Sequence, residues 1–311
     1  MYLARKEKFG KGEKITLLNE ATRESATFAL WGATLLDLVL KKGKNNHRII
    51  DGYKHPEELL KHHLSKNIKL IPFPNRIKDG KYLFEKKEYQ LPINFPAQHH
   101  AIHGLLFQRK FFVQKMSADK NHAAAVLHYH YRRENAGYPF LMDVNLEYSL
   151  DKKGFSCTTT IENKDSKNIP IADGWHPYFT LGKRADDWLL LIPSHKKIEV
   201  DERMIPTGKK ITLSKFQKLE KINNEQFDTG FIIKKKGTAI TKLKHKELTI
   251  NLWQETGKSK YNYLQVFIPP LRNAIALEPM TCSTDAFNNK EGLIVLKPKQ
   301  KFTASYGVFL S

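Results

Sequence analysis

Alternation of apolar and polar residues with a period of two is the feature that most restricts what this chain can fold into. Residues 125–131 and 142–150 alternate in this way, as half-buried strands do. The second run continues through Asp151–Gly154 into residues 155–161, which predicts a hairpin with a four-residue loop whose glycine takes a positive φ. Further strands are predicted at residues 188–192, 248–253, 263–268, 274–277 and 302–310.

Helix signals are few in this sequence. Residues 56–63 predict one short helix and residues 285–289 predict a further helical turn. Many short strands separated by turn residues indicate an all-β fold, a large antiparallel β-sandwich or barrel. Because no repeat or long linker interrupts the pattern, we expect one domain spanning residues 1–311.

The formal net charge of +20 raises the question of a nucleic-acid partner. Residues that follow a phosphate backbone usually cluster on one element, whereas these lysines are scattered and mostly flank turns. Solvated surface lysines are therefore the favoured interpretation, and no nucleic acid is expected. A phosphorylated or acidic small ligand remains as an alternative.

The location of the protein is predicted from its termini and cysteines. Residues 1–14 are charged and lack the apolar core of a signal peptide, and the longest apolar stretch, residues 28–40, is too short to cross a bilayer. Cys157 and Cys282 lie far apart, and two buried thiols are favoured over a disulfide. We therefore expect a cytoplasmic protein without a membrane partner; nothing in the sequence specifies an oligomeric state.

Two residues beside prolines are candidates for acid–base chemistry. His176 follows Gly174-Trp175 and precedes Pro177, which favours an extended conformation for the histidine. Glu278 ends an apolar strand, and the partial desolvation expected there raises the basicity of a carboxylate, as a general base requires. A histidine and a carboxylate of this kind can serve one pocket.

Four short motifs, taken in order, resemble the aldose 1-epimerase (mutarotase) family. They are Asn75-Arg76-Ile77, His103-Gly104, His176-Pro177-Tyr178-Phe179 and Leu277-Glu278-Pro279, and the resemblance spans roughly residues 70 to 285. It implies the galactose mutarotase-like supersandwich and an isomerase that interconverts the anomers of a free aldohexose. It also implies that Glu278 is the general base and His176 the general acid, with no metal or redox cofactor.

The same resemblance implies a set of sugar-binding residues. These are Asn75, Arg76, His103, Asp228 and Gln265. A guanidinium offers a planar fork of donors to adjacent hydroxyls, and a carboxylate accepts from them, so these residue types suit a sugar. Arg76 is predicted to open a hairpin that turns at Asp79-Gly80. The segment Pro269–Asn273 looks shorter than in typical galactose mutarotases, which leaves the choice of sugar open.

The sequence gives less support to other kinds of site. His100 and His103 would point to opposite faces of a strand, and their segment holds no cysteine or carboxylate, so no metal site is predicted there. Dinucleotide, P-loop and serine-hydrolase motifs are absent. A carboxylate pair of the glycosidase type, Asp228 with Glu278, stays open from the residues alone. The alternatives retained are a hexose-6-phosphate 1-epimerase of the same fold and a non-catalytic carbohydrate-binding sandwich.

Overall fold

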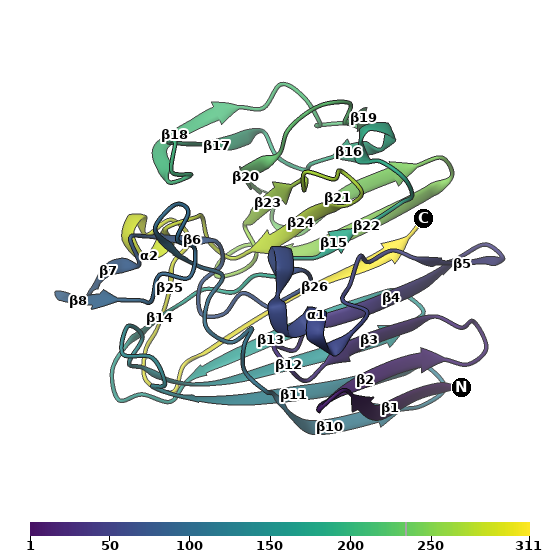
Figure 1. Ribbon diagram of the computed structural model, residues 1–311, viewed down its shortest axis with the longest axis horizontal. Helices are drawn as coiled ribbons and strands as arrows, with labels where there is room; N and C mark the ends of the chain where they lie inside the picture. The colour runs from purple at the N-terminus through teal and green to yellow at the C-terminus, as the bar shows by residue number, and fades with distance from the viewer. Residues whose placement is uncertain (234) are drawn as a thin grey trace.

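The computed structural model describes residues 1–233 and 235–311, and this part of the chain consists mostly of antiparallel strands (Figure 1). The predicted all-β class is confirmed, as are the strands expected at residues 125–131, 142–150 and 155–161. The connecting turn is tighter than predicted, because Asp151 pairs directly with Gly154. Gly154 has the expected positive φ, at 104°.

The largest sheet has nine strands and includes the last strand of the described chain near its middle. Apolar side chains alternate along its long strands, so one face is buried and the other is partly exposed. In sheet order its strands are β10 (Phe112–Ala118), β11 (His122–Arg132), β12 (Leu141–Asp151), β13 (Gly154–Asn163), β26 (Lys301–Leu310), β22 (Leu248–Thr256), β21 (Gly237–His245), β16 (Leu189–Leu191) and β19 (Glu220–Lys221).

A five-stranded sheet packs on the buried face of this large sheet, as the purple and teal layers of Figure 1 show. The rings of Phe28 and Tyr148 lie with centroids 4.5 Å apart across the two layers, and the Tyr148 hydroxyl donates to the Ala33 carbonyl at 2.6 Å. Buried aromatic pairs of this kind supply much of the apolar area that holds two sheets together. The strands are β1 (Tyr2–Phe9), β2 (Gly12–Asn19), β3 (Ser25–Ala29), β4 (Leu35–Lys42) and β5 (Asn45–Arg48).

A six-stranded sheet carries the strand that holds Glu278. All six residues of that strand are buried, in keeping with the apolar run read from the sequence. In sheet order the strands are β15 (Tyr178–Phe179), β24 (Ile275–Met280), β23 (Tyr263–Phe267), β20 (Asp228–Ile232), β17 (Lys196–Val200) and β18 (Pro206–Thr212).

Three strand pairs and four short helices complete the described elements. The two expected helices form, as α1 (Pro56–Lys61) and α2 (Ala286–Asn289). The prediction of a hairpin at Asp79-Gly80 is wrong. The turn forms, but the strands before and after it do not pair with each other, and each pairs with another strand. The pairs are β6 (Arg76–Lys78) with β9 (His100–Ile102), β7 (Lys81–Phe84) with β8 (Lys87–Gln90), and β14 (Ile169–Ile171) with β25 (Ile294–Leu296); the 3₁₀ helices are His63–Ser65 and Ala185–Asp187.

Two further sequence expectations concern the cysteines and the membrane. Cys157 and Cys282 are both buried free thiols, as predicted. Among the described residues, no helix has the length and apolar character needed to span a bilayer.

Candidate active site

A cleft of about 520 Å³ brings six of the seven predicted site residues together. Loops and strand ends from widely separated parts of the sequence form its walls, next to α1. The predicted residues in its lining are Asn75, Arg76, His103, His176, Asp228 and Glu278. Gln265 does not line this cleft and faces a smaller adjoining cavity instead.

The pair of β6 with β9 positions one wall of the cleft. Arg76 lies opposite Ile102, and the next residue, His103, donates its backbone N–H to the Asn75 carbonyl at 2.9 Å. Asn75 and His103 both have positive φ values, 54° and 66°. Asparagine and histidine tolerate this conformation better than most residues, which allows the chain to turn both side chains into the cleft.

The segment that carries His176 is held by a neighbouring stretch of chain. The His176 N–H donates to the Ile68 carbonyl at 3.1 Å, and the Leu70 N–H donates to the Gly174 carbonyl at 2.9 Å. A side chain at position 174 would place its Cβ 3.0 Å from Pro74, so glycine permits the close approach expected from the sequence. The backbone on both sides of His176 is therefore fixed.

His176 and Glu278 form the chemical centre of the cleft. Glu278 lies within β24, directly opposite Gln265 of β23, and its side chain is almost fully buried. The Nε2 atom of His176 lies 3.3 Å from Glu278 Oε1. The ring of His103 packs against that of His176 with centroids 4.9 Å apart. The acid–base pair expected from two distant motifs is thus assembled in space.

Burial dominates the electrostatics of this pair. It raises the pKa of Glu278 well above its usual range, with the negative charge of Asp228 adding to the effect and Arg76 opposing it. Burial also lowers the pKa of His176 to about 3 and that of His103 well below its usual value. A pair that holds a single proton has no net charge, so it is the form that this environment favours.

Three buried polar atoms of the cleft lack a hydrogen-bond partner within the described part of the chain. They are Glu278 Oε2, His176 Nδ1 and His103 Nδ1. An unpaired buried polar atom costs about 1–3 kcal/mol, so such groups usually meet a ligand or water. All three residues line the same cleft, which suits a molecule with several hydroxyl groups.

Asp228 and Arg76 form the charged rim of the cleft. Arg76 Nη2 lies 3.3 Å from Asp228 Oδ2, and Arg76 Nη1 donates to Asn75 Oδ1 at 2.8 Å. Gln265 Nε2 donates to Asp228 Oδ1 at 2.6 Å from behind. Gln265 thus contacts Asp228 and does not line the cleft itself, and the sugar contact that the family resemblance implies for Gln265 stays a prediction.

A buried ion pair lies where the segments that carry His176 and Glu278 are hydrogen-bonded to each other. Lys69 and Asp173 are fully buried, with the ammonium 2.9 Å from the carboxylate. The ammonium also donates to Tyr306 Oη at 3.2 Å, and Tyr261 Oη donates to Asp173 at 2.6 Å. Asp173 and Thr281 bond twice, from the Asp173 N–H to the threonine hydroxyl and from the Thr281 N–H to the aspartate carbonyl. This arrangement, here called the Lys69 network, fixes the distance between the two segments.

Several cleft residues have no counterpart among the sequence predictions. Phe95 lies under the guanidinium of Arg76, 5.8 Å from ring centroid to Cζ. Lys61, Phe107 and Gln108 also line the cleft, from α1 and from a loop. These three residues belong to no alternating pattern and no motif, so the sequence gives no signal for them. Tyr178 also lines the cleft, and it lies within the His176-Pro177-Tyr178-Phe179 motif.

Comparison with known sequences identifies similar proteins and one matching family. A protein-family model described as Aldose 1-epimerase matches residues 13–308. The Uncharacterized protein YihR of Escherichia coli (strain K12) is 33% identical over 301 residues, which cover 91% of this chain and 90% of that protein. Galactose mutarotase of Rattus norvegicus is 26% identical over 186 residues, which cover 57% of this chain and 52% of that protein.

Comparison with solved structures gives the fold. A galactose mutarotase-like protein from Clostridium acetobutylicum superimposes with a TM-score of 0.87 at 20% identity, covering 100% of this chain and 98% of the other. Galactose 1-epimerase from Lactobacillus acidophilus NCFM gives a TM-score of 0.82 at 19% identity, with 100% and 98% covered. The fold is therefore galactose mutarotase-like, as the sequence motifs implied.

Proposed function

The chain belongs to the aldose 1-epimerase family, and we propose that it interconverts the α and β anomers of a free aldohexose by general acid–base ring opening. The observation that carries this proposal is the buried contact of His176 Nε2 with Glu278 Oε1 at 3.3 Å. It lies in a cleft that also presents Arg76, His103 and Asp228 to a ligand. Opening a pyranose hemiacetal needs one group that takes a proton and one that gives a proton at the same time.

The proposed reaction assigns one role to each member of the pair. Glu278 takes the proton of the C1 hydroxyl while His176 gives a proton to the ring oxygen, and the C1–O5 bond breaks to leave the open aldehyde. Rotation about C1–C2 presents the other face of the carbonyl, and the ring closes with the two roles reversed. Arg76, His103 and Asp228 hold the remaining hydroxyls, so that the open chain recloses in place.

One shared proton is sufficient for both roles. In the sugar-free cleft the pKa shifts place this proton on Glu278, because burial raises the pKa of the carboxyl and lowers that of His176. Sugar hydroxyls that donate to Glu278 Oε2 stabilise the carboxylate, and the proton then resides on His176. The positive charge of Arg76 favours the same ionised carboxylate.

Polarimetry of freshly dissolved sugars tests the proposal. We expect the wild-type protein to accelerate the relaxation of optical rotation of α-galactose or α-glucose well above the spontaneous rate. Acceleration of glucose 6-phosphate alone would replace this function by the hexose-6-phosphate alternative. Saturable sugar binding with no acceleration of any of the three would instead indicate a non-catalytic sandwich.

The phosphate alternative draws support from Lys61, a cation that lines the cleft. The charged lining residues are the cations Lys61 and Arg76 and the carboxylates Asp228 and Glu278. Because the pair of Glu278 and His176 carries no net charge when it holds one proton, the lining has a formal charge of only +1. The net charge of +20 is therefore not concentrated where a phosphorylated sugar would bind. This balance favours the free aldohexose.

Neutralising either of the two charged residues beside Glu278 is expected to shift the pH profile of kcat/KM, and the two variants should shift it in opposite directions. In the free enzyme the shared proton lies on Glu278, so the loss of this proton sets the alkaline limb of the profile. Arg76 lowers the pKa of Glu278, so Arg76→Gln raises that pKa and moves the alkaline limb to higher pH. Asp228 raises the pKa of Glu278, so Asp228→Asn moves the alkaline limb to lower pH. Both variants lose a sugar contact and raise KM. Profiles that shift in the same direction, or do not shift, would contradict Glu278 as the base.

A further inference from the structure

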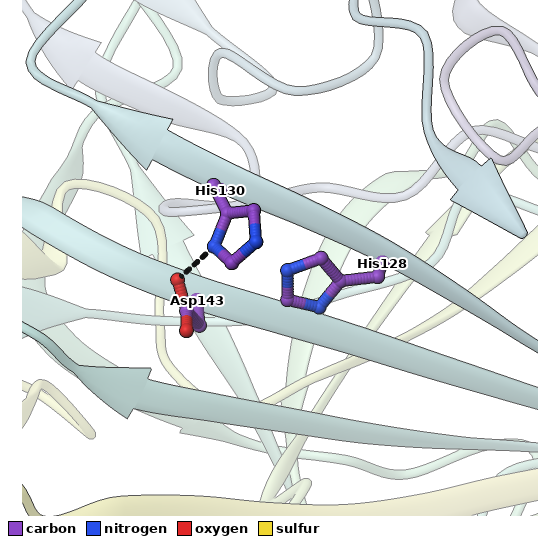
Figure 2. Close-up of side chains that lie close together, drawn as sticks. All are labelled: His128, His130 and Asp143. Atoms are coloured by element: carbon purple, nitrogen blue, oxygen red, sulfur yellow. Dashed lines mark hydrogen bonds and ion pairs between the residues drawn. The ribbon is translucent and has the colours of Figure 1, made fainter. Parts of the chain in front are cut away.

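Two imidazoles lie side by side on the partly exposed face of the nine-stranded sheet, away from the cleft (Figure 2). His128 and His130 are separated by one residue on β11, so their side chains leave the same face of the strand. The register with β12 places Asn145 opposite His128 and Asp143 opposite His130. The centroids of the two rings are only 3.9 Å apart.

Hydrogen bonds fix which nitrogen of each ring carries the proton. His128 Nδ1 lies 2.6 Å from Asn145 Oδ1, and His130 Nδ1 lies 2.6 Å from Asp143 Oδ1. Carbonyl and carboxylate oxygens only accept hydrogen bonds, so each ring donates from Nδ1. The lone pair of each neutral imidazole is then on Nε2.

The two Nε2 atoms are turned toward one another. Figure 2 shows a nitrogen of each ring facing the other ring, on the side away from the Nδ1 bond of His130 to Asp143. The Nε2 atom of His128 is buried and has no hydrogen-bond partner among the residues that the structure describes. A buried acceptor that faces a second acceptor is costly unless a donor or a cation lies between them, and a metal ion can accept a lone pair from both.

We propose that the Nε2 atoms of His128 and His130 bind a late first-row divalent metal ion, with Zn²⁺ as the probe. Ligand atoms of His128, His130 and Asp143 can be chosen that all lie within 4.8 Å of one another. Imidazole suits Zn²⁺, Cu²⁺ and Ni²⁺, and metal-bound histidines usually donate their other N–H to a carboxylate or carbonyl oxygen. Asp143 and Asn145 make those bonds here, and water completes the coordination on the exposed side.

This site was not among the sequence predictions, which considered metal only at His100 and His103. The partners of His128 and His130 on β12 follow only from the sheet register, which the sequence alone does not give. Lys164 is the cation that opposes binding, since its ammonium lies 3.7 Å from Asp143 Oδ2.

Isothermal titration of the full chain with ZnCl₂ in a non-coordinating buffer tests the proposal. We expect one saturable site, weakened at least about tenfold by His130→Asn and about 10–100-fold by Asp143→Asn, which removes the charge behind the ring. His122→Asn is the matched control: His122 lies on the same strand and contacts Asp119, but belongs to no such pair, so its replacement leaves affinity unchanged. Lys164→Gln tightens binding about two- to fivefold, a gain that misfolding does not produce.

Three results would overturn this site. One is the absence of saturable Zn²⁺ binding by the wild-type protein, and another is equal affinity in wild type and His130→Asn. The third is binding that His176→Asn abolishes while His130→Asn leaves it intact, which would place the ion at the His103–His176 contact in the cleft. Polarimetric activity of His130→Asn reports on its folding, because His130 does not line the cleft.

Discussion

Glu278→Gln is expected to lower kcat for mutarotation by about 10²–10⁴-fold, the range that a positioned general base contributes. Glutamine keeps the size of the side chain and its oxygen but accepts no proton at neutral pH. Because the position lies in the middle of a buried strand, the cleft should keep its shape and KM should change little. Polarimetry over a range of sugar concentrations separates the two constants.

The stability of Glu278→Gln provides a second, independent readout. Folding raises the pKa of Glu278, so the protonated carboxyl favours the folded state. This contribution to the free energy of unfolding is lost as the pH rises through the raised pKa. Glutamine cannot ionise, and the melting temperature of the variant should therefore equal or exceed that of wild type at neutral and alkaline pH. Glu247→Gln, an exposed glutamate outside the cleft, is the control and should change neither quantity. A variant that retains wild-type kcat would exclude Glu278 as the base.

Lys69→Met is expected to lower the free energy of unfolding by about 3–5 kcal/mol, since it leaves the Asp173 carboxylate buried without its cation. The pair is fully buried, so water does not screen the loss. Asp173 lies three residues before His176 and bonds to Thr281, three residues after Glu278, so activity should fall as well. Chemical denaturation followed by tryptophan fluorescence measures the change in stability.

The double variant Lys69→Met with Asp173→Asn is the control for this prediction. It removes both charges while the asparagine oxygen can still accept from Tyr261, so it should recover part of the lost stability. If the single variant costs less than about 1 kcal/mol, or if the double variant is the less stable of the two, the Lys69 network does not act as a buried ion pair.

The sequence predicts the strands of this fold well and their pairing less well. Alternation over residues 125–131 and 142–150 marks half-buried strands because the side chains of a strand point to opposite faces in turn. No local pattern indicates that β26 lies between β13 and β22, or that β6 pairs with β9. Those choices depend on contacts between distant residues, which alternation does not encode.

A site residue can be predicted from the sequence where a charged or titratable side chain stands next to residues that rarely accompany it, such as an apolar run or a proline. Glu278 directly after an apolar run and His176 before a proline are such cases, and the structure brings them together. The strand itself continues beyond Glu278 to Met280, so the predicted strand end at Glu278 is wrong. Lys69 is the opposite case, because it is one of 52 lysines and arginines and nothing in its neighbours shows that it is buried. Gln265 shows a third outcome, in which the residue lies beside the cleft and contacts Asp228 without lining the cleft itself.

The central place of β26 in the nine-stranded sheet has a consequence for synthesis of the protein. Its neighbours β13 and β22 both precede it in the chain, so on the ribosome each waits with an unpaired edge until residues 301–310 emerge. Tyr306, which bonds to Lys69, arrives with the same strand, so the support beneath His176 is incomplete until then. The β13 edge is open from the synthesis of β13 onward, and the β22 edge joins it for the interval between β22 and β26. Open strand edges are the kind of surface that pairs with other chains and that chaperones protect.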